Sequence, residues 1–300
     1  MNIEIPEGYT FIKILGAEKT RKYNQVALIK NNLEETFVLK SCPLSDENGC
    51  ALLLREFQFN FEDEISLPQK SILDKTSYYL HLILPFKKGV LLQEHWKSLK
   101  KKERTSFLLH FIPTFLQLID KVHQNGVYHN DIRPGNILID EETIHLIDFG
   151  MASKQEEAPR KTLFSLSYSS PELILNQLSL IDETSDLYSF GMLLIELISG
   201  KTLFTHENPA VLTQLAITYP VKLKGIVPKE LEAIIEKMCG KPIFKTTPNK
   251  IPKEELVALI KATQAERKIE KTSLENNFKN ALENYQKRRK NRSFSRYQVG

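Results

Sequence analysis

The chain has 300 residues, of which 41% are apolar and 26% are charged, proportions that are ordinary for a soluble globular protein. Its 41 Lys and Arg residues against 37 Asp and Glu give a formal net charge of +4. That excess is too small to indicate nucleic-acid binding, because such a surface also needs its charges to cluster. The cysteines lack metal-ligand spacing, no secretory leader is recognisable near Met1, and no apolar run is long enough to span a bilayer. We therefore expect a soluble, cytoplasmic protein with reduced thiols.

The first 86 residues favour β-strands. Four segments there are rich in aromatic, aliphatic and β-branched residues and are candidate strands: 9–15, 26–29, 36–39 and 78–84. Between the third and the fourth, residues 50–61 carry leucine and phenylalanine at helical spacing.

Beyond Gly89 the pattern changes to helices. Apolar residues recur at helical spacing in three segments: 107–123, 189–198 and 231–238. Pro113 lies within the first segment, so that helix is either kinked there or begins there. Gly200 closes the second segment, as glycine often does at a helix end.

A third, more polar region covers residues 263–300. Four apolar residues within it lie on one face of a predicted helix: Leu274, Phe278, Leu282 and Tyr285. A basic cluster follows at 287–292. The first interpretation is a helix that packs on its own domain and ends in solvent. The alternative is a tail that docks on a partner or on an anionic surface.

Polar residues that point to chemistry lie in and after a loop in the middle of the chain. Asp131 and Asn136 are five positions apart, directly before the apolar segment 137–139, and Asp148 follows a second apolar segment. Phosphoryl transfer needs a carboxylate that accepts the proton of the attacking hydroxyl, and oxygen ligands for Mg²⁺. Asp131 suits the first task, and Asn136 and Asp148 suit the second. Each residue alone could be a loop former, so their joint arrangement carries the prediction.

Residues 129–139 resemble the catalytic loop of protein kinases, H-R-D-x-x-x-x-N, and residues 147–150 resemble the D-F-G turn that follows it. Ser170-Pro171-Glu172 is similar to the A-P-E that closes the kinase activation segment. Residues 186–191 resemble the start of the central helix, whose aspartate braces the catalytic loop. The matching stretches extend over roughly residues 9–260.

The resemblance implies a two-lobed α+β fold. A small antiparallel β-sheet lobe with one helix, residues 1–86, is expected to bind the nucleotide. A larger, mainly α-helical lobe, residues 87–262, is expected to carry the catalytic loop and the substrate-docking surface. The charged region 263–300 lies outside both.

The same resemblance implies further roles. Lys40, at the end of Phe37-Val38-Leu39-Lys40, is expected to contact the α- and β-phosphates of ATP, with Glu56 as its ion-pair partner. Arg133 keeps a positive charge near the γ-phosphate two positions after Asp131, which favours serine/threonine specificity. The residues implied to line the nucleotide are Gly16, Val26, Lys40, Leu84, Phe86 and Leu138. Leu84 and Phe86 would lie at the adenine-binding hinge, with the register open by one position; the alternative is that they are core residues.

The glycine-rich loop departs most from the family pattern. Only Gly16 remains of G-x-G-x-x-G, in which glycines let the backbone lie close over the phosphates. Weak nucleotide affinity or an unusual lid is the direct expectation.

Three further positions also depart from the pattern. Asn130 replaces the arginine that usually binds a phosphorylated activation loop, so we expect that such phosphorylation is not the main switch. Glu172 lacks its usual arginine partner, for which Lys245 is a substitute. Asn60, four positions after Glu56, stands where an apolar residue normally packs toward Phe149.

Three functions fit these residues. The first is a protein kinase that uses ATP and Mg²⁺ (or Mn²⁺) to phosphorylate serine or threonine in protein substrates. The second is a pseudokinase or scaffold of the same fold, motivated by the degenerate glycine-rich loop. The third is a small-molecule phosphotransferase, which also uses H-x-D-x-x-x-x-N, although the Ser-Pro-Glu closure argues against it.

Overall fold

The computed structural model describes residues 3–16, 25–59, 72–75, 78–141, 143–155, 157, 163–227 and 229–240. The chain falls into two compact units, one made of Met1–Gly89 with His145–Ala152 and the other of Val90–Ile144 with Ser153–Gly300. The sequence placed the boundary between residues 86 and 87. It did not indicate that residues 145–152, far along the chain, belong to the first unit. The predicted tail helix lies outside the described residues.

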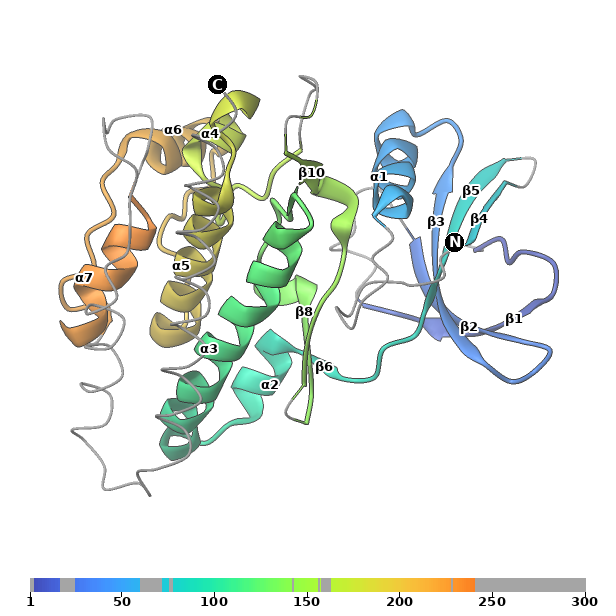
Figure 1. Cartoon of the computed structure of the whole chain (residues 1–300), viewed down its shortest axis with the longest axis horizontal. Helices are drawn as coiled ribbons and strands as arrows, with labels where there is room; N and C mark the ends of the chain where they lie inside the picture. Colours follow the sequence, from blue (N-terminus) through green and yellow to red (C-terminus); the bar gives the residue numbers. More distant parts are fainter. Residues whose placement is uncertain are drawn as a thin grey trace. The chain divides into compact units, whose positions relative to one another are not determined.

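The first unit contains a five-stranded antiparallel sheet of order β1-β2-β3-β5-β4 (Figure 1). Its strands are β1 (Tyr9–Ile14), β2 (Gln25–Asn31), β3 (Thr36–Pro43), β4 (Ile72–Lys75) and β5 (Tyr79–Pro85). All four strands predicted from composition are present. Side chains alternate between the two faces of the sheet. One face buries Ala27, Ile29, Leu39 and Ile83, and the other buries Cys42, Leu80, Leu82 and Leu84 together with Leu53.

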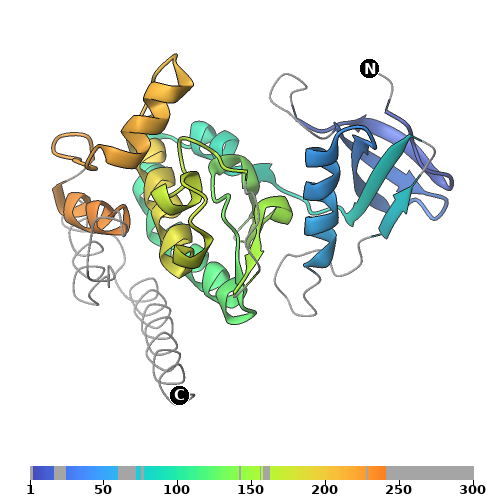
Figure 2. The ribbon, with the colours of Figure 1, turned by 90° about the horizontal axis from the view of Figure 1, so that it is seen from above.

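Helix α1 (Glu47–Gln58) packs on the second face of this sheet, as Figures 1 and 2 show. The helix begins three residues before the predicted start at 50, because the Asp46 carboxylate caps it by accepting a hydrogen bond from Gly49 N (3.0 Å). The short helix η3 (Phe149–Met151) packs against α1. A Cβ atom at Gly150 would lie 3.3 Å from Leu52 Cβ, so glycine permits this close approach.

The second unit is mainly helical. Its longer helices are α2 (Leu92–Ser98), α3 (Lys101–Gln124), α5 (Glu183–Ser199), α6 (Pro209–Thr218) and α7 (Lys229–Met238). Its shorter helical turns are η2 (Pro134–Asn136), α4 (Pro171–Ile174) and η4 (Leu178–Leu180). Two small sheets have the orders β6-β8-β9 and β10-β7. Their strands are β6 (Val90–Leu91), β7 (Val127–Tyr128), β8 (Ile137–Asp140), β9 (Thr143–Leu146) and β10 (Ser153–Lys154), and the last two residues of β9 are counted with the first unit.

Helices α3 and α5 lie side by side in the core of this unit (Figures 1 and 2). The ring of Phe190 on α5 lies 4.6 Å from that of Phe115 and 6.0 Å from that of Phe111, both on α3. Helix α3 is one helix from Lys101 to Gln124, so the alternative that it begins at Pro113 is wrong.

The end of α5 agrees with the sequence prediction better than its beginning does. The helix starts six residues earlier than predicted, because the Asp182 carboxylate accepts a hydrogen bond from Thr184 N at 2.7 Å. It ends as predicted at Gly200, which adopts a left-handed conformation with φ of 80°.

The small antiparallel sheet with one helix and the larger helical unit confirm the α+β fold. Within the described residues, no helix has the length and apolar character needed to cross a membrane.

Leu53 links α1 to the sheet, and its side chain is fully buried. We expect Leu53→Ala to lower the free energy of unfolding by about 2–5 kcal/mol, because it removes core packing and leaves a cavity. Leu54 on the same helix is 43% exposed, so Leu54→Ala is the matched control and should change it by about 0.5 kcal/mol or less. Chemical denaturation measures both. Equal losses in the two variants would contradict the described orientation of α1.

Candidate active site

Lys40 on β3 forms two ion pairs within the first unit. Its Nζ atom lies 2.5 Å from Glu56 Oε2 on α1 and 3.0 Å from Asp148 Oδ1, which directly precedes η3. Both Lys40 and Glu56 are buried, whereas the side chain of Asp148 is 42% exposed. The structure therefore brings together the predicted lysine, its predicted partner and one predicted metal ligand, from three separate stretches of the chain.

Burial by itself would lower the pKa of Lys40, since it disfavours the charged amine. The negative charges of Asp148 and Glu56 outweigh that effect and leave the pKa above its ordinary value. Lys40 is thus held as a fixed cation near neutral pH. A buried cation of this kind suits the binding of an anionic group such as a phosphate.

Asp148 is held in a left-handed backbone conformation with φ of 69°, which aspartate tolerates better than most residues. The next residue, Phe149, is buried and packs on Phe59, with ring centroids 6.3 Å apart. Phe59 thus makes an apolar contact with Phe149, whereas Asn60, which departs from the family pattern, lies outside the described residues. Arg55 Nη1 donates to the carbonyl oxygen of Ala152 (3.1 Å) and fixes the far end of the same turn.

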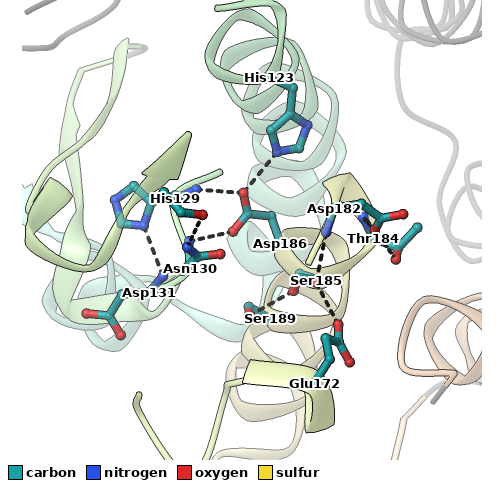
Figure 3. Close-up of polar contacts among 11 residues, drawn as sticks. His123, His129, Asn130, Asp131, Glu172, Asp182, Thr184, Ser185, Asp186 and Ser189 are labelled. Atoms are coloured by element: carbon teal, nitrogen blue, oxygen red, sulfur yellow. Dashed lines mark hydrogen bonds and ion pairs between the residues drawn. The ribbon is translucent and has the colours of Figure 1, made fainter. Parts of the chain in front are cut away.

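The catalytic-loop segment of the second unit is fastened to α5 by the carboxylate of Asp186 (Figure 3). Its Oδ2 atom accepts a hydrogen bond from His129 N (2.8 Å) and lies 2.9 Å from His123 Nε2. Its Oδ1 atom accepts a hydrogen bond from Asn130 N (2.8 Å). One side chain therefore orients two successive peptide groups of the loop.

Asp186 is completely buried, and burial alone would raise its pKa. The hydrogen bond and positive potential of His123, with further contributions from His129, lower the pKa below its ordinary value instead. The carboxylate therefore stays ionised in the interior, because the donors around it compensate for the lost hydration.

Asp131 lies next in the loop, and its carboxylate is surrounded by donors. Oδ2 accepts from Asn136 Nδ2 (2.6 Å) and from Arg133 Nε (3.2 Å), and Oδ1 accepts from the hydroxyl of Ser165 (2.5 Å). The Asp131 N–H donates to Nδ1 of His129 (3.2 Å), as Figure 3 shows. The structure thus brings together three sequence-predicted site residues of this unit, and Ser165 brings a hydroxyl group directly onto Asp131.

Asn130 connects the loop to the start of the activation segment. Its backbone is left-handed (φ 63°), and its Nδ2 donates to the hydroxyl of Ser153 on β10 (2.8 Å). Both residues are buried. This neutral contact stands where the family pattern has an arginine that binds a phosphorylated segment. The sequence shows the loss of that arginine but carries no signal for the contact that Ser153 makes.

The activation segment has two further contacts that the sequence did not predict. Tyr168 donates its hydroxyl hydrogen to Glu196 Oε2 on α5 (2.5 Å). Glu172 is buried and accepts a hydrogen bond at Oε1 from the hydroxyl of Ser185 (2.6 Å), also on α5 (Figure 3). Lys245, the substitute partner expected for Glu172, lies outside the described residues.

The residues implied to line the nucleotide are placed as follows. Gly16 lies two residues after the end of β1, with φ of 74°, and residues 17–24 after it lie outside the described residues. Val26 is buried and is the β2 partner of Lys40. Leu84 packs in the core cluster on the α1 side of the sheet, whereas Phe86 and Leu138 are partly exposed.

The residues expected to hold a metal ion have the right donor chemistry. Both hydrogen bonds of Asn136 Nδ2 go to Asp131, which directs the amide nitrogen inward and leaves the amide oxygen for a cation. Asp148 offers a partly exposed carboxylate. The described residues contain no cluster of three or more His, Cys, Asp or Glu that would hold a metal alone. Carboxylate and amide oxygens are the donors that Mg²⁺ prefers in proteins.

Comparison with known proteins agrees with this geometry. A protein kinase domain matches residues 22–293. The chain belongs to the protein kinase family. Human mitogen-activated protein kinase 12 is 28% identical over 201 residues, which are 66% of this chain and 49% of that protein. Human mitogen-activated protein kinase 13 is 24% identical over 237 residues, 79% of this chain and 59% of that protein.

A plant relative, the serine/threonine-protein kinase AtPK1/AtPK6 of Arabidopsis thaliana, is 27% identical over 172 residues, 56% of this chain and 36% of that protein. This kinase chain thus spans about half of the length of the mitogen-activated protein kinases that it matches.

Glu172 allows a prediction about pH. Burial raises its pKa above the ordinary value, and the hydrogen bond from Ser185 offsets this only in part. Because the pKa is higher in the folded chain than in the unfolded chain, ionising Glu172 costs stability as the pH rises through the folded-state pKa. We expect Glu172→Gln to stabilise the kinase relative to the wild type at pH 8 and to lose that advantage as the pH falls toward the ordinary glutamate pKa. Urea denaturation at several pH values measures this difference.

Ser199→Ala, at the partly exposed C-terminal end of α5, is the control and should show no such pH-dependent difference. A Glu172→Gln variant that is equally destabilised at every pH would contradict the prediction.

Proposed function

We propose that this chain is an active protein kinase that transfers the γ-phosphate of Mg-ATP to serine or threonine hydroxyls of protein substrates. The observation that carries the proposal is the Asp131 carboxylate, which is hydrogen-bonded to Asn136, Arg133 and the hydroxyl of Ser165. A carboxylate that already accepts a hydrogen bond from a serine hydroxyl has the surroundings needed to accept one from an acceptor side chain.

In the proposed reaction, the acceptor oxygen attacks the γ-phosphorus and its proton passes to the Asp131 carboxylate. A new bond forms between this oxygen and the phosphorus, the bond from the phosphorus to the β–γ bridging oxygen breaks, and ADP leaves. Arg133 offers a positive charge beside Asp131 for the γ-phosphate. Hydrogen bonds from Asn136 and Ser165 hold the carboxylate in a single orientation before the acceptor binds.

The first unit is proposed to bind the nucleotide. Lys40, kept cationic by Glu56 and Asp148, would contact the α- and β-phosphates. Asp148 and Asn136 would hold Mg²⁺, and that ion supplies charge neutralisation on the phosphate oxygens when it is bound. The second unit would supply the base and the surface that docks the protein substrate.

Serine/threonine specificity rests on two observations. Arg133 lies two positions after Asp131, where serine/threonine kinases carry a basic residue, and its Nε contacts the base itself. One relative, AtPK1/AtPK6, is named a serine/threonine-protein kinase. The Asn130–Ser153 hydrogen bond supports activity without a phosphorylated activation segment, since a neutral contact takes the place of the arginine.

The test uses γ-labelled ATP, Mg²⁺ and four peptides that differ only in carrying Ser, Thr, Tyr or Ala at one acceptor position. We expect label on the Ser and Thr peptides alone. Asp131→Asn should lower the transfer rate by about 10²–10⁴-fold through loss of the base, and Lys40→Met should lower it by about 10²-fold or more through loss of a preorganised charge. Lys30→Met and Asp140→Asn are matched controls outside the site and should retain wild-type rates.

Wild-type rates in Asp131→Asn would contradict the proposed base. Measurable Mg-ATP binding without label on any peptide would favour a binding module of the same fold. Label on an amino alcohol or sugar, and not on the peptides, would favour a small-molecule phosphotransferase.

A further inference from the structure

Two cysteines of the first unit converge on one backbone oxygen. Cys42 Sγ lies 3.5 Å from the carbonyl oxygen of Pro43, and Cys50 Sγ lies 3.4 Å from the same oxygen. Cys42 is on β3 and Cys50 is in the first part of α1, so the two thiols come from different elements. Neither takes part in the proposed phosphoryl transfer.

A tight connection between β3 and α1 produces this arrangement. Asp46 N donates to the Pro43 carbonyl oxygen (2.9 Å), and Cys50 N donates to the Asp46 carbonyl oxygen (2.9 Å) as the first turn of α1 forms. The Cys42 thiol also lies 3.6 Å from that Asp46 oxygen. Well-formed backbone hydrogen bonds therefore position the chain that carries both thiols, and the thiol contacts with the Pro43 and Asp46 carbonyl oxygens orient the sulfurs.

The two thiols differ in accessibility. Cys42 is completely buried in the core cluster with Leu53, and Cys50 packs against that cluster while remaining partly exposed. Burial raises the pKa of Cys42 to about 12, with added effects from the adjacent Cys50 and Asp46. An oxidant in solution would thus reach Cys50 first, and Cys42 would be the thiol that reacts second.

We propose that Cys42 and Cys50 form a reversible peroxide-sensitive pair that oxidises to an intramolecular disulfide between β3 and α1. In the first step the Cys50 sulfur attacks hydrogen peroxide, the O–O bond breaks, and Cys50 becomes a sulfenic acid with release of water. In the second step the Cys42 sulfur attacks the sulfenic sulfur, the S–O bond breaks, the S–S bond forms, and a second water leaves. The two thiols lose two electrons and peroxide gains them.

The location gives the disulfide a consequence for the kinase site. Cys42 lies two positions after Lys40, so both side chains point to the same face of β3. Cys50 lies six positions before Glu56 on α1. A covalent link here restrains the strand and the helix whose side chains form the buried Lys40–Glu56 ion pair. It also converts a partly exposed thiol into a form that peroxide no longer oxidises further to a sulfinic acid.

The experiment treats the full chain with a small molar excess of hydrogen peroxide and then counts free thiols by alkylation. We expect alkylatable cysteines to fall from the three of the reduced protein to one. Peptide mass mapping without reductant should show a Cys42–Cys50 link, with the mass lowered by two hydrogen atoms. Dithiothreitol should restore all three thiols. Cys239, buried beside Tyr188 in the second unit, supplies the control: Cys239→Ser should form the same link.

Two variants keep the proposal falsifiable. Cys50→Ser changes a partly exposed position and should leave Cys42 reduced after the peroxide treatment. Cys42→Ala should instead accumulate sulfinic acid at Cys50, and thermal unfolding shows whether this core variant is folded. The proposal is overturned if the wild type shows sulfinic acid at Cys50 without the link. It is equally overturned if oxidised cysteines pair only between two molecules.

Discussion

The buried carboxylate of Asp186 is the constraint on which the rest of the candidate site depends. An ionised group without water must be surrounded by hydrogen-bond donors, and here two of the donors are successive backbone N–H groups of the catalytic loop, His129 and Asn130. The need to satisfy that charge therefore fixes the loop backbone, including the left-handed conformation of Asn130. Asp131 is the next residue, so the hydrogen bonds to His129 and Asn130 also position its backbone. Its carboxylate is oriented by Asn136.

Charged contacts hold Lys40 of the candidate site, whereas hydroxyl groups make two of the contacts that hold the activation segment. Lys40 is one of the residues proposed for catalysis. Charge-assisted hydrogen bonds to Glu56 and Asp148 hold its side chain strongly in one orientation. Two contacts that connect the activation segment to its surroundings are made with hydroxyl groups instead: Asn130 donates to Ser153, and Glu172 accepts from Ser185. A segment held by hydroxyl contacts needs no added phosphate to complete them. Whether phosphorylation of this segment acts as a switch stays a prediction from the loss of the arginine at position 130.

Local patterns in the sequence predicted most of the fold. Strands and helices were located by their apolar periodicity, and the helix end at Gly200 followed from glycine at a left-handed position. The starts of α1 and α5 were missed by three and six residues, because the capping carboxylates Asp46 and Asp182 precede turns that have little apolar character. Spacing and the family resemblance named the candidate site residues, of which the structure brings together Lys40, Glu56 and Asp148 in the first unit, and Asp131, Arg133 and Asn136 in the second. The sequence carried no signal for the packing of Phe59 on Phe149 or for similar long-range contacts, because these depend on how distant elements pack.

The most direct test of the role of Asp186 separates kcat from KM for ATP in Asp186→Asn. The variant removes the charge that positions the catalytic loop and leaves Lys40 and Asp148 unchanged. We predict a loss of about 100-fold in kcat, the cost expected for a displaced catalytic group, with KM for ATP nearly unchanged. Thermal unfolding identifies the folded fraction, to which the rate is normalised. A wild-type kcat in the folded variant, or an equal loss carried by KM for ATP alone, would contradict the view that this buried carboxylate holds Asp131 in place.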